Sequence, residues 1–282
     1  METINNPQEL QNLCLMLRSE GKKIGLVPTM GYFHNGHLSL MDAARKQCDV
    51  LIVSLFVNPT QFGENEDLDA YPHDLERDAK LAEEHGVDIL FAPVRDEMYF
   101  DDHCTWVEVP DLAVNLCAES RPVHFRGVAT VVTKLFMTAQ PHVAVFGQKD
   151  WQQLAIIKRM VRDLNIPVDV QGHEIVREES GLALSSRNVY LTDEEKSVAP
   201  NIQKGLQKMK AQVASGESDA DKLKSDLADF YAETIPHSRI DYIEIVDPDN
   251  INILKKVDKY ALCAVAVQVG KARLIDNLLI KV

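Results

Sequence analysis

Short apolar runs alternate with amphipathic stretches along the first part of the chain. Four apolar runs are predicted to be strands buried on both faces, which is typical of a parallel sheet: residues 24–27, 50–57, 87–91 and 142–146. Helical apolar spacing marks four further stretches, at residues 38–45, 75–85, 128–138 and 151–164. Because strands and helices alternate, we expect right-handed crossovers and ligands bound beyond the carboxyl ends of the strands.

The pattern changes near Arg177. Thr192 is predicted to cap a helix, because Glu195 stands at the capping-box position. Two polar helical stretches and three strand-like runs follow, at residues 194–213, 220–234, 241–246, 260–269 and 271–280. The sequence therefore predicts an α/β protein with a Rossmann-like doubly wound parallel sheet in residues 1–176 and a smaller α+β lid domain in residues 177–282.

Composition narrows the class of protein. The 282 residues are 45% hydrophobic and 26% charged, as in ordinary globular proteins. The formal net charge of −13 disfavours nucleic acid or an anionic membrane as a partner, because attraction to phosphate needs a basic surface. No apolar run approaches the ~20 residues of a membrane helix, and the N-terminus lacks a secretory signal, so we expect a cytoplasmic protein. The five cysteines include no CxxC pair, which argues against a disulfide framework and a thiolate zinc site.

The first candidate site is the segment PTMGYFHNGH, residues 28–37, between the first predicted strand and a helix. A glycine turn there can bring main-chain N–H groups and the positive end of the helix to a phosphate, with His34 and His37 on one side of the turn. This arrangement suits a nucleoside triphosphate. Two alternatives stay open: ordinary loop or core histidines, and a partial zinc site that lacks its other ligands.

The second candidate is LSSR at residues 184–187, near the predicted domain junction. Its two hydroxyls and the guanidinium of Arg187 can contact a polyphosphate. Alone, the motif is more simply a polar turn. Paired with the two histidines, it predicts the second half of a phosphate clamp that closes about a hinge near residues 176–184.

The third candidate is FGQKDWQQ at residues 146–153, which follows a predicted strand. Gly147 permits close approach of the main chain, and Lys149 offers a cation to phosphate. Asp150 can accept hydrogen bonds from a ribose, and Gln153 can point toward the same crevice one turn later. The alternative for Asp150 is a helix N-cap.

The fourth candidate is FVNPTQFG at residues 56–63, again after a predicted strand. Asn58 and Gln61 carry neutral amides, which can bind a small polar substrate without imposing charge. The alternative is a purely structural loop.

These segments resemble the pantothenate synthetase (pantoate–β-alanine ligase) family over nearly the whole chain. The resemblance rests on PTMGYFHNGH, FVNPTQFG, DLDAYPH, RPVHFRGVATVVTKLF, FGQKDWQQL, REESGLALSSRN and DYIEIVDP. HxGH and the SSR variant of the KMSKS signature are shared by a wider nucleotidyltransferase superfamily, whereas TQFG, FGQKDWQQL and HFRGVATVV are much more specific. His73 and Asn35 stand where Arg and Glu are common in the family, and neither change removes a group that the chemistry needs.

The resemblance implies ligation of pantoate and β-alanine with ATP, through a pantoyl-adenylate, in pantothenate and coenzyme A biosynthesis. A transition state that spreads negative charge over phosphate oxygens favours fixed cations and N–H donors. His37 would be the proton donor within a catalytic set of His34, His37, Lys149, Ser185, Ser186 and Arg187. The implied ATP contacts are Met30, Gly31, His34, Gly36, His37, Gly147, Gln148, Lys149, Asp150, Val176, Leu184, Ser185, Ser186 and Arg187.

By the same resemblance, Gln61 and Gln153 would hold pantoate, and Gln61 would also touch β-alanine. The substrate-binding set is then Pro28, Met30, Asn58, Gln61, Val131, Val132 and Gln153, in which amides suit the hydroxyls of pantoate and apolar walls suit its gem-dimethyl group. Mg²⁺ is expected on the ATP phosphates, with Asp78 as its protein contact. The family implies a homodimer.

Three other functions remain as alternatives at this point. A nucleotidyltransferase that passes AMP to a phosphorylated acceptor would need more cationic residues at the acceptor site than Gln61 and Gln153 supply. A catalytically silent ATP sensor would be favoured by loss of His37, Lys149 or Arg187, which are all present. A zinc-binding module is the remaining non-enzyme hypothesis, which metal analysis would test.

Overall fold

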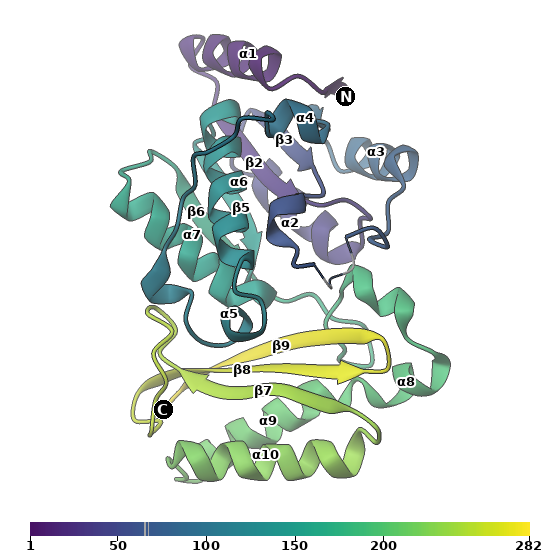
Figure 1. The fold of residues 1–282 in the computed structure, drawn as a ribbon, viewed down its shortest axis with the longest axis vertical. Helices are drawn as coiled ribbons and strands as arrows, with labels where there is room; N and C mark the ends of the chain where they lie inside the picture. Colours follow the sequence, from purple (N-terminus) through teal and green to yellow (C-terminus); the bar gives the residue numbers. More distant parts are fainter. Residues whose placement is uncertain (65, 67) are drawn as a thin grey trace. The chain divides into compact units, whose positions relative to one another are not determined.

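The computed structural model describes residues 1–64, 66 and 68–282, and within them the chain forms two compact units (Figure 1). Unit 1 comprises residues 1–110, 121–148 and 156–174, and unit 2 comprises residues 111–120, 149–155 and 175–282. Unit 2 therefore takes two short segments from the N-terminal part of the chain. The domain boundary between residues 176 and 177 stays a prediction. Asp67, the first residue of the DLDAYPH motif, lies outside the described residues.

A parallel sheet forms the centre of unit 1. Its strands, as far as the structure describes the chain, are β1 (Glu2–Ile4), β2 (Ile24–Thr29), β3 (Val50–Leu55), β4 (Ile89–Phe91), β5 (Val143–Gly147) and β6 (Asp169–His173), in the order β1-β4-β3-β2-β5-β6. Strand β2 pairs with β3 on one side and with β5 on the other. The winding direction reverses there, and the segments after these strands leave from one edge of the sheet. The predicted doubly wound α/β sheet is confirmed.

Unit 1 also contains helices, of which α1, α2 and α6 contact the sheet. They are α1 (Pro7–Ser19), α2 (Asn35–Arg45), α3 (Leu75–Glu84), α4 (Arg95–Met98) and α6 (His124–Ala139), with most of α7 (Trp151–Asp163). Helix α2 lies beside α3, and α1 lies beside α6 (Figure 1). Gly86 has a φ of +71° just beyond the end of α3, a left-handed conformation in which glycine commonly terminates a helix. Short 3₁₀ turns are η1 (Pro59–Gln61), η2 (Pro110–Leu112) and η3 (Gln148–Asp150).

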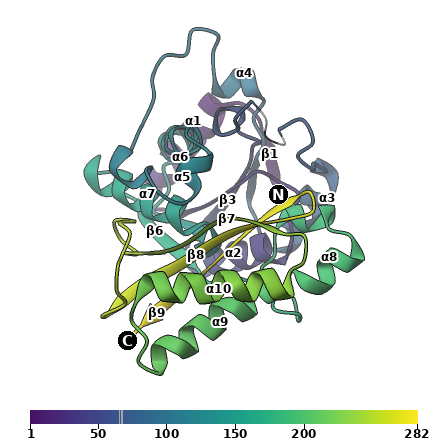
Figure 2. The ribbon, with the colours of Figure 1, turned by 60° about the horizontal axis from the view of Figure 1, so that its bottom comes forward.

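Unit 2 is an antiparallel sheet with helices on one face (Figure 2). The sheet has the order β7 (Arg239–Val246), β8 (Tyr260–Val269) and β9 (Ala272–Lys281). Helices α9 (Asn201–Ala214) and α10 (Ala220–Thr234) lie side by side against it. The remaining elements are α5 (Cys117–Ser120), α8 (Asp193–Val198) and the 3₁₀ turn η4 (Ser186–Tyr190). Leu206, Leu227 and Val265 belong to its core, and the predicted smaller α+β part of the fold is confirmed.

Three of the differences between the structure and the sequence-based prediction have a clear physical reason. The predicted helical stretch 194–213 is divided into α8 and α9, because Pro200 at the break has no N–H to donate. Helix α1 was not predicted, although Asn6 caps it and Pro7 begins it. Strand β6 was also missed, since this edge strand carries half-buried polar residues instead of an apolar run. The predicted capping box of Thr192 and Glu195 is confirmed. None of the helices in the described ranges is long and apolar enough to cross a bilayer.

Candidate functional site

The turn between β2 and α2 is held from the side by α3. Gly31 has a φ of +88°, and a Cβ there would lie 3.1 Å from the Asp78 carboxylate. Asp78 is fully buried, and its two oxygens accept the main-chain N–H groups of Tyr32 and Phe33, the latter at 2.8 Å. Arg77 donates to the carbonyl oxygen of Phe33 at 2.8 Å. Helix α3 thereby fixes the turn that leads into the two histidines.

The rings of His34 and His37 stack at the start of α2. Their centroids are 4.1 Å apart and their planes meet at 30°. Nδ1 of His34 accepts the N–H of Gly36 at 3.1 Å, and Nδ1 of His37 accepts the N–H of His34 at 3.3 Å. A ring nitrogen that accepts a hydrogen bond cannot carry the proton, so each neutral ring is protonated at Nε2. Both rings can therefore donate to an anion, close to the positive end of the helix.

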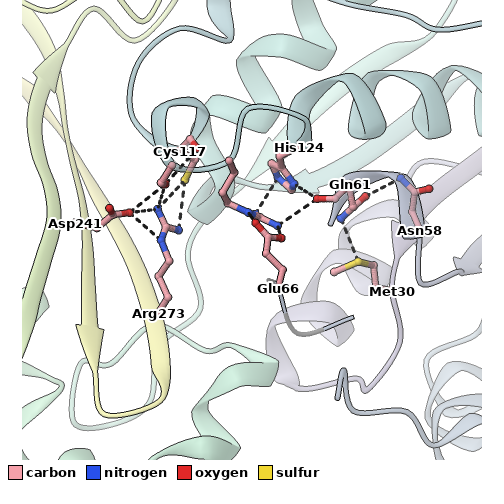
Figure 3. Close-up of polar contacts among 10 residues, drawn as sticks. Met30, Asn58, Gln61, Glu66, Cys117, His124, Asp241 and Arg273 are labelled. Atoms are coloured by element: carbon pink, nitrogen blue, oxygen red, sulfur yellow. Dashed lines mark hydrogen bonds and ion pairs between the residues drawn. The ribbon is translucent and has the colours of Figure 1, made fainter. Parts of the chain in front are cut away.

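Three of the predicted substrate-binding residues come together after β2 and β3 (Figure 3). The Asn58 amide donates to Oε1 of Gln61 at 3.1 Å, and Nε2 of Gln61 donates to the sulfur of Met30 at 3.2 Å. Asn58 and Gln61 are both buried. The contacts orient the Gln61 amide, which is what a group that binds one small substrate in one pose requires.

Helix α6 packs tightly against the segment that carries Gln61. A Cβ on Gly127 would come within 2.6 Å of the Gln61 nitrogen, so only glycine fits there. Asn58 also donates to the carbonyl oxygen of Gly127 at 3.2 Å. Further along α6, the side chains of Val131 and Val132 are buried. The predicted apolar residues thus belong to the same helix that supports Gln61.

A chain of polar contacts supports Gln61 from the start of α6. Nδ1 of His124 lies 3.0 Å from the Gln61 carbonyl oxygen, and Nε2 of His124 lies 3.2 Å from Nη1 of Arg121 (Figure 3). Arg121 makes two hydrogen bonds to the Glu66 carboxylate, at 2.7 and 2.6 Å. Burial raises the pKa of Glu66, but the hydrogen bonds and charge of Arg121 outweigh it, so that the pKa lies below its usual value. These three residues are not among the predicted site residues, although they stand in RPVHF and in the acidic stretch after Gly63.

The remaining predicted residues of unit 1 lie at strand ends. Pro28 is half-buried near the end of β2. Gly147 ends β5, and no atom lies within 4 Å of the place where its Cβ would stand. Gln148 follows it and donates to the carbonyl oxygen of Gly172 at 3.4 Å. The main chain at the end of β5 is therefore open to a ligand.

In unit 2, two predicted phosphate-binding residues share a small pocket. Lys149 and Ser185 line it together with Leu182, Ala183, Ile202, Gln203, Leu274, Ile275 and Asp276. Ser185 also caps η4, because its hydroxyl accepts the N–H of Arg187 at 3.3 Å. The LSSR segment is thus a structured turn whose hydroxyl and main chain are both defined. Val176 and Leu184 are half-buried and Ser186 is buried.

The two glutamines at the start of α7 have different environments. Gln152 is buried, where its amide donates to the carbonyl oxygens of Leu112 and Asn115 and accepts the N–H of Cys117. Gln153, the predicted substrate contact, is only half-buried. Asp150 is exposed. The first glutamine therefore holds the short segment 111–120 in unit 2, which leaves the second for a ligand.

Arg273 contacts the same short segment from the sheet of unit 2. Arg273 of β9 contacts Asp241 of β7 at 2.9 and 2.6 Å (Figure 3). Its two terminal nitrogens also lie 3.7 Å from the sulfur of Cys117. Within the described ranges, no group of three or more His, Cys, Asp and Glu side chains could hold a metal ion.

Comparison with known proteins agrees with this arrangement. Residues 2–279 match the pantoate-β-alanine ligase family. Over 282 residues the chain is 86% identical to a pantothenate synthetase of Maridesulfovibrio salexigens, with 100% of both chains covered. The crystal structure of pantothenate synthetase from Thermus thermophilus superposes with a TM-score of 0.92 at 44% identity, covering 99% of each chain. Pantoate-β-alanine ligase from Francisella tularensis, crystallised with "Beta-gamma ATP" and β-alanine, gives a TM-score of 0.80 at 33% identity, covering 99% of this chain and 97% of that one.

Proposed function

The chain belongs to the pantoate–β-alanine ligase family and is an ATP-using enzyme that makes pantothenate, and we propose that it does so through a pantoyl-adenylate. In the first step a carboxylate oxygen of pantoate bonds to the α-phosphorus of ATP, and the bond to pyrophosphate breaks. In the second step the β-alanine amine bonds to the carbonyl carbon, AMP leaves, and the nitrogen gives up a proton. The product amide is pantothenate.

The observation that carries this proposal is the pair of histidines at the start of α2. Both rings have Nδ1 occupied by a main-chain N–H, so Nε2 is the donor in each. Negative charge grows on the phosphate oxygens as pyrophosphate leaves, and fixed N–H donors stabilise that charge more than they stabilise the substrate. We assign His37 as the proton donor to the departing phosphate and His34 as its neighbouring donor.

Unit 2 carries further residues that are predicted to bind ATP. We propose that Lys149 and Arg187 contact the phosphates, with the hydroxyls of Ser185 and Ser186 beside them. The shared pocket of Lys149 and Ser185 supports this assignment. The further ATP contacts are proposed at Met30, Gly31, Gly36, Gly147, Gln148, Asp150, Val176 and Leu184.

Pantoate is proposed to bind at the oriented amide of Gln61. The amide can contact a hydroxyl or carboxylate, and Asn58 and Met30 hold it in place. The apolar side chains of Val131 and Val132 suit the gem-dimethyl group, and the remaining contacts are proposed at Pro28 and Gln153. Gln61 is also the proposed contact for β-alanine in the second step.

Mg²⁺ is proposed to reach the site bound to the phosphates of ATP. Among the protein groups, Asp78 fits poorly as its ligand, because both carboxylate oxygens already accept main-chain N–H groups. Burial raises the pKa of Asp78, and those N–H groups and Arg77 limit the rise. A magnesium contact by Asp78 stays a prediction, and we derive no step from it. A homodimer and a cytoplasmic location are proposed on membership of the family alone.

The test is the release of pyrophosphate from ATP and Mg²⁺. We expect a single burst with pantoate alone, and sustained formation of AMP and pantothenate once β-alanine is added. Silence with pantoate but turnover with a phosphorylated acceptor would identify a nucleotidyltransferase instead. Silence with every acceptor would favour an ATP sensor.

A further inference from the structure

One strand of unit 2 contacts both segments that carry its proposed phosphate-binding residues. Asp276 and Asn277 are consecutive in β9, and both are buried. Consecutive side chains of a strand project from opposite faces of the sheet. Leu274, on the same face as Asp276, belongs to the core formed with α9. Asp276 therefore faces that core, and Asn277 faces the other side of the sheet.

Asp276 holds the segment that leads into the LSSR motif. Its carboxylate pairs with both terminal nitrogens of Arg177, at 2.6 and 2.9 Å. Arg177 also donates to the carbonyl oxygen of Gly181 at 3.1 Å, and its main chain pairs with Ala183 across the turn. The ion pair therefore fixes a narrow loop whose second arm continues directly into Leu184.

Asn277 holds the segment that carries Lys149. Its side-chain amide donates to the main-chain oxygen of Lys149 at 2.9 Å. Its own main-chain N–H donates to Oδ1 of Asp276 at 2.8 Å, which is the oxygen that pairs with Arg177. A continuous path of hydrogen bonds thus joins Arg177, Asp276, Asn277 and Lys149.

We propose that Arg177, Asp276 and Asn277 are positioning residues that set Lys149 against Ser185 for the phosphates of ATP. Asp276 lines the same pocket as Lys149 and Ser185, so one member of the network lies beside the two residues that it would align. A buried ion pair is a poor source of net stability, because its desolvation offsets its attraction. The bidentate geometry of the pair instead fixes the direction of the Arg177 side chain, which suits a positioning role. The inference rests on the proposed function for its ATP contacts.

Two kinds of variant separate positioning from folding. Asn277→Ala and Asn277→Asp both remove the donor to the Lys149 carbonyl, and the second keeps the size of the side chain. The double variant Arg177→Met with Asp276→Leu replaces the ion pair by apolar groups of similar volume, which proteins tolerate. In the pyrophosphate-release assay we expect the KM for ATP to rise about 10-fold in each, because small misplacement of a bound group is costly, with the KM for pantoate within about twofold of wild type.

The matched control is Lys224→Met, which removes a half-buried ion pair with Glu244 elsewhere in unit 2. It should leave both KM values unchanged. An unchanged KM for ATP in folded Asn277→Ala and Asn277→Asp enzymes would overturn the inference, even if the double variant does not fold. An equal rise in both KM values would also overturn it, because that result indicates a general loss of structure. Failure of the proposed function is distinct, since wild type would then release no pyrophosphate with pantoate.

Discussion

The side-chain amide of Asn58 donates to Oε1 of Gln61 at 3.1 Å and thereby decides which end of the Gln61 amide faces Met30. One amide orients another, and both are buried. The group proposed to bind pantoate is therefore fixed before the substrate arrives, which reduces the entropy lost on binding.

Replacing Gln61 should weaken the binding of pantoate and leave the binding of ATP unchanged. We expect Gln61→Ala to raise the KM for pantoate about 10-fold or more, because a substrate hydroxyl or carboxylate loses its partner. Gln61→Glu should be worse, since it adds a negative charge next to a carboxylate substrate. Initial rates at varied pantoate and saturating ATP measure both effects. An unchanged KM for pantoate would show that Gln61 does not contact it.

Because the neutral His37 ring is protonated at Nε2, different substitutions of His37 should retain different amounts of activity. We expect His37→Ala to slow adenylation about 10²-fold or more, as expected for loss of a transition-state donor. His37→Gln places an N–H near the position of Nε2, whereas His37→Asn places one near Nδ1, so the Gln variant should retain more activity. Single-turnover pyrophosphate release compares the three. Equal rates for Gln and Asn would contradict the Nε2 assignment.

His124 should affect the binding of pantoate indirectly, through its contact with Gln61. Asn at this position keeps an N–H near Nδ1, which can still donate to the Gln61 carbonyl, while Phe keeps the ring but no donor. We therefore expect His124→Phe to raise the KM for pantoate several-fold, roughly the loss of one hydrogen bond, and His124→Asn to raise it less. The KM for ATP serves as the internal control. Identical behaviour of the two variants would reduce the role of His124 to packing.

The Arg121–Glu66 pair predicts a pH-dependent contribution to stability. Glu66 has a pKa below its usual value of 4.5. A lowered carboxylate pKa stabilises the fold fully above that usual value, and the contribution is lost as the pH falls through the folded-state pKa. We expect Glu66→Gln to lower the free energy of unfolding by about 1–3 kcal/mol at neutral pH, with the difference narrowing below pH 4.5. Urea unfolding at several pH values measures it, and a difference independent of pH would contradict the assignment.

The parts of the fold that follow from local pattern were predictable. Continuous apolar runs located β2, β3, β4 and β5, because a strand covered on both faces has no polar side. The candidate loops were found for a related reason, since they stand directly after those strands. Helix α1 is predictable in the same local way, from the cap residue Asn6 and from Pro7 in its first turn.

The supporting contacts could not be found in this way. Asp78 lies 45 residues from Phe33, and Asp276 lies 99 residues from Arg177. Such pairs do not follow the two-residue repeat of a strand or the 3.6-residue repeat of a helix, so the sequence does not indicate which residues come into contact when the chain folds. The sequence therefore predicted candidate groups for the chemistry, whereas the residues that contact and support those candidates came from the structure.

Gly127 also bears on how this enzyme could be redesigned. Any other residue there would push against the main chain of Thr60 and Gln61, so a substitution of Gly127 would misplace the amide that is proposed to bind pantoate. Val131 stands one turn further along the same helix, and Val132 follows it. A library aimed at bulkier or smaller hydroxy acids should vary those two valines and keep the glycine fixed.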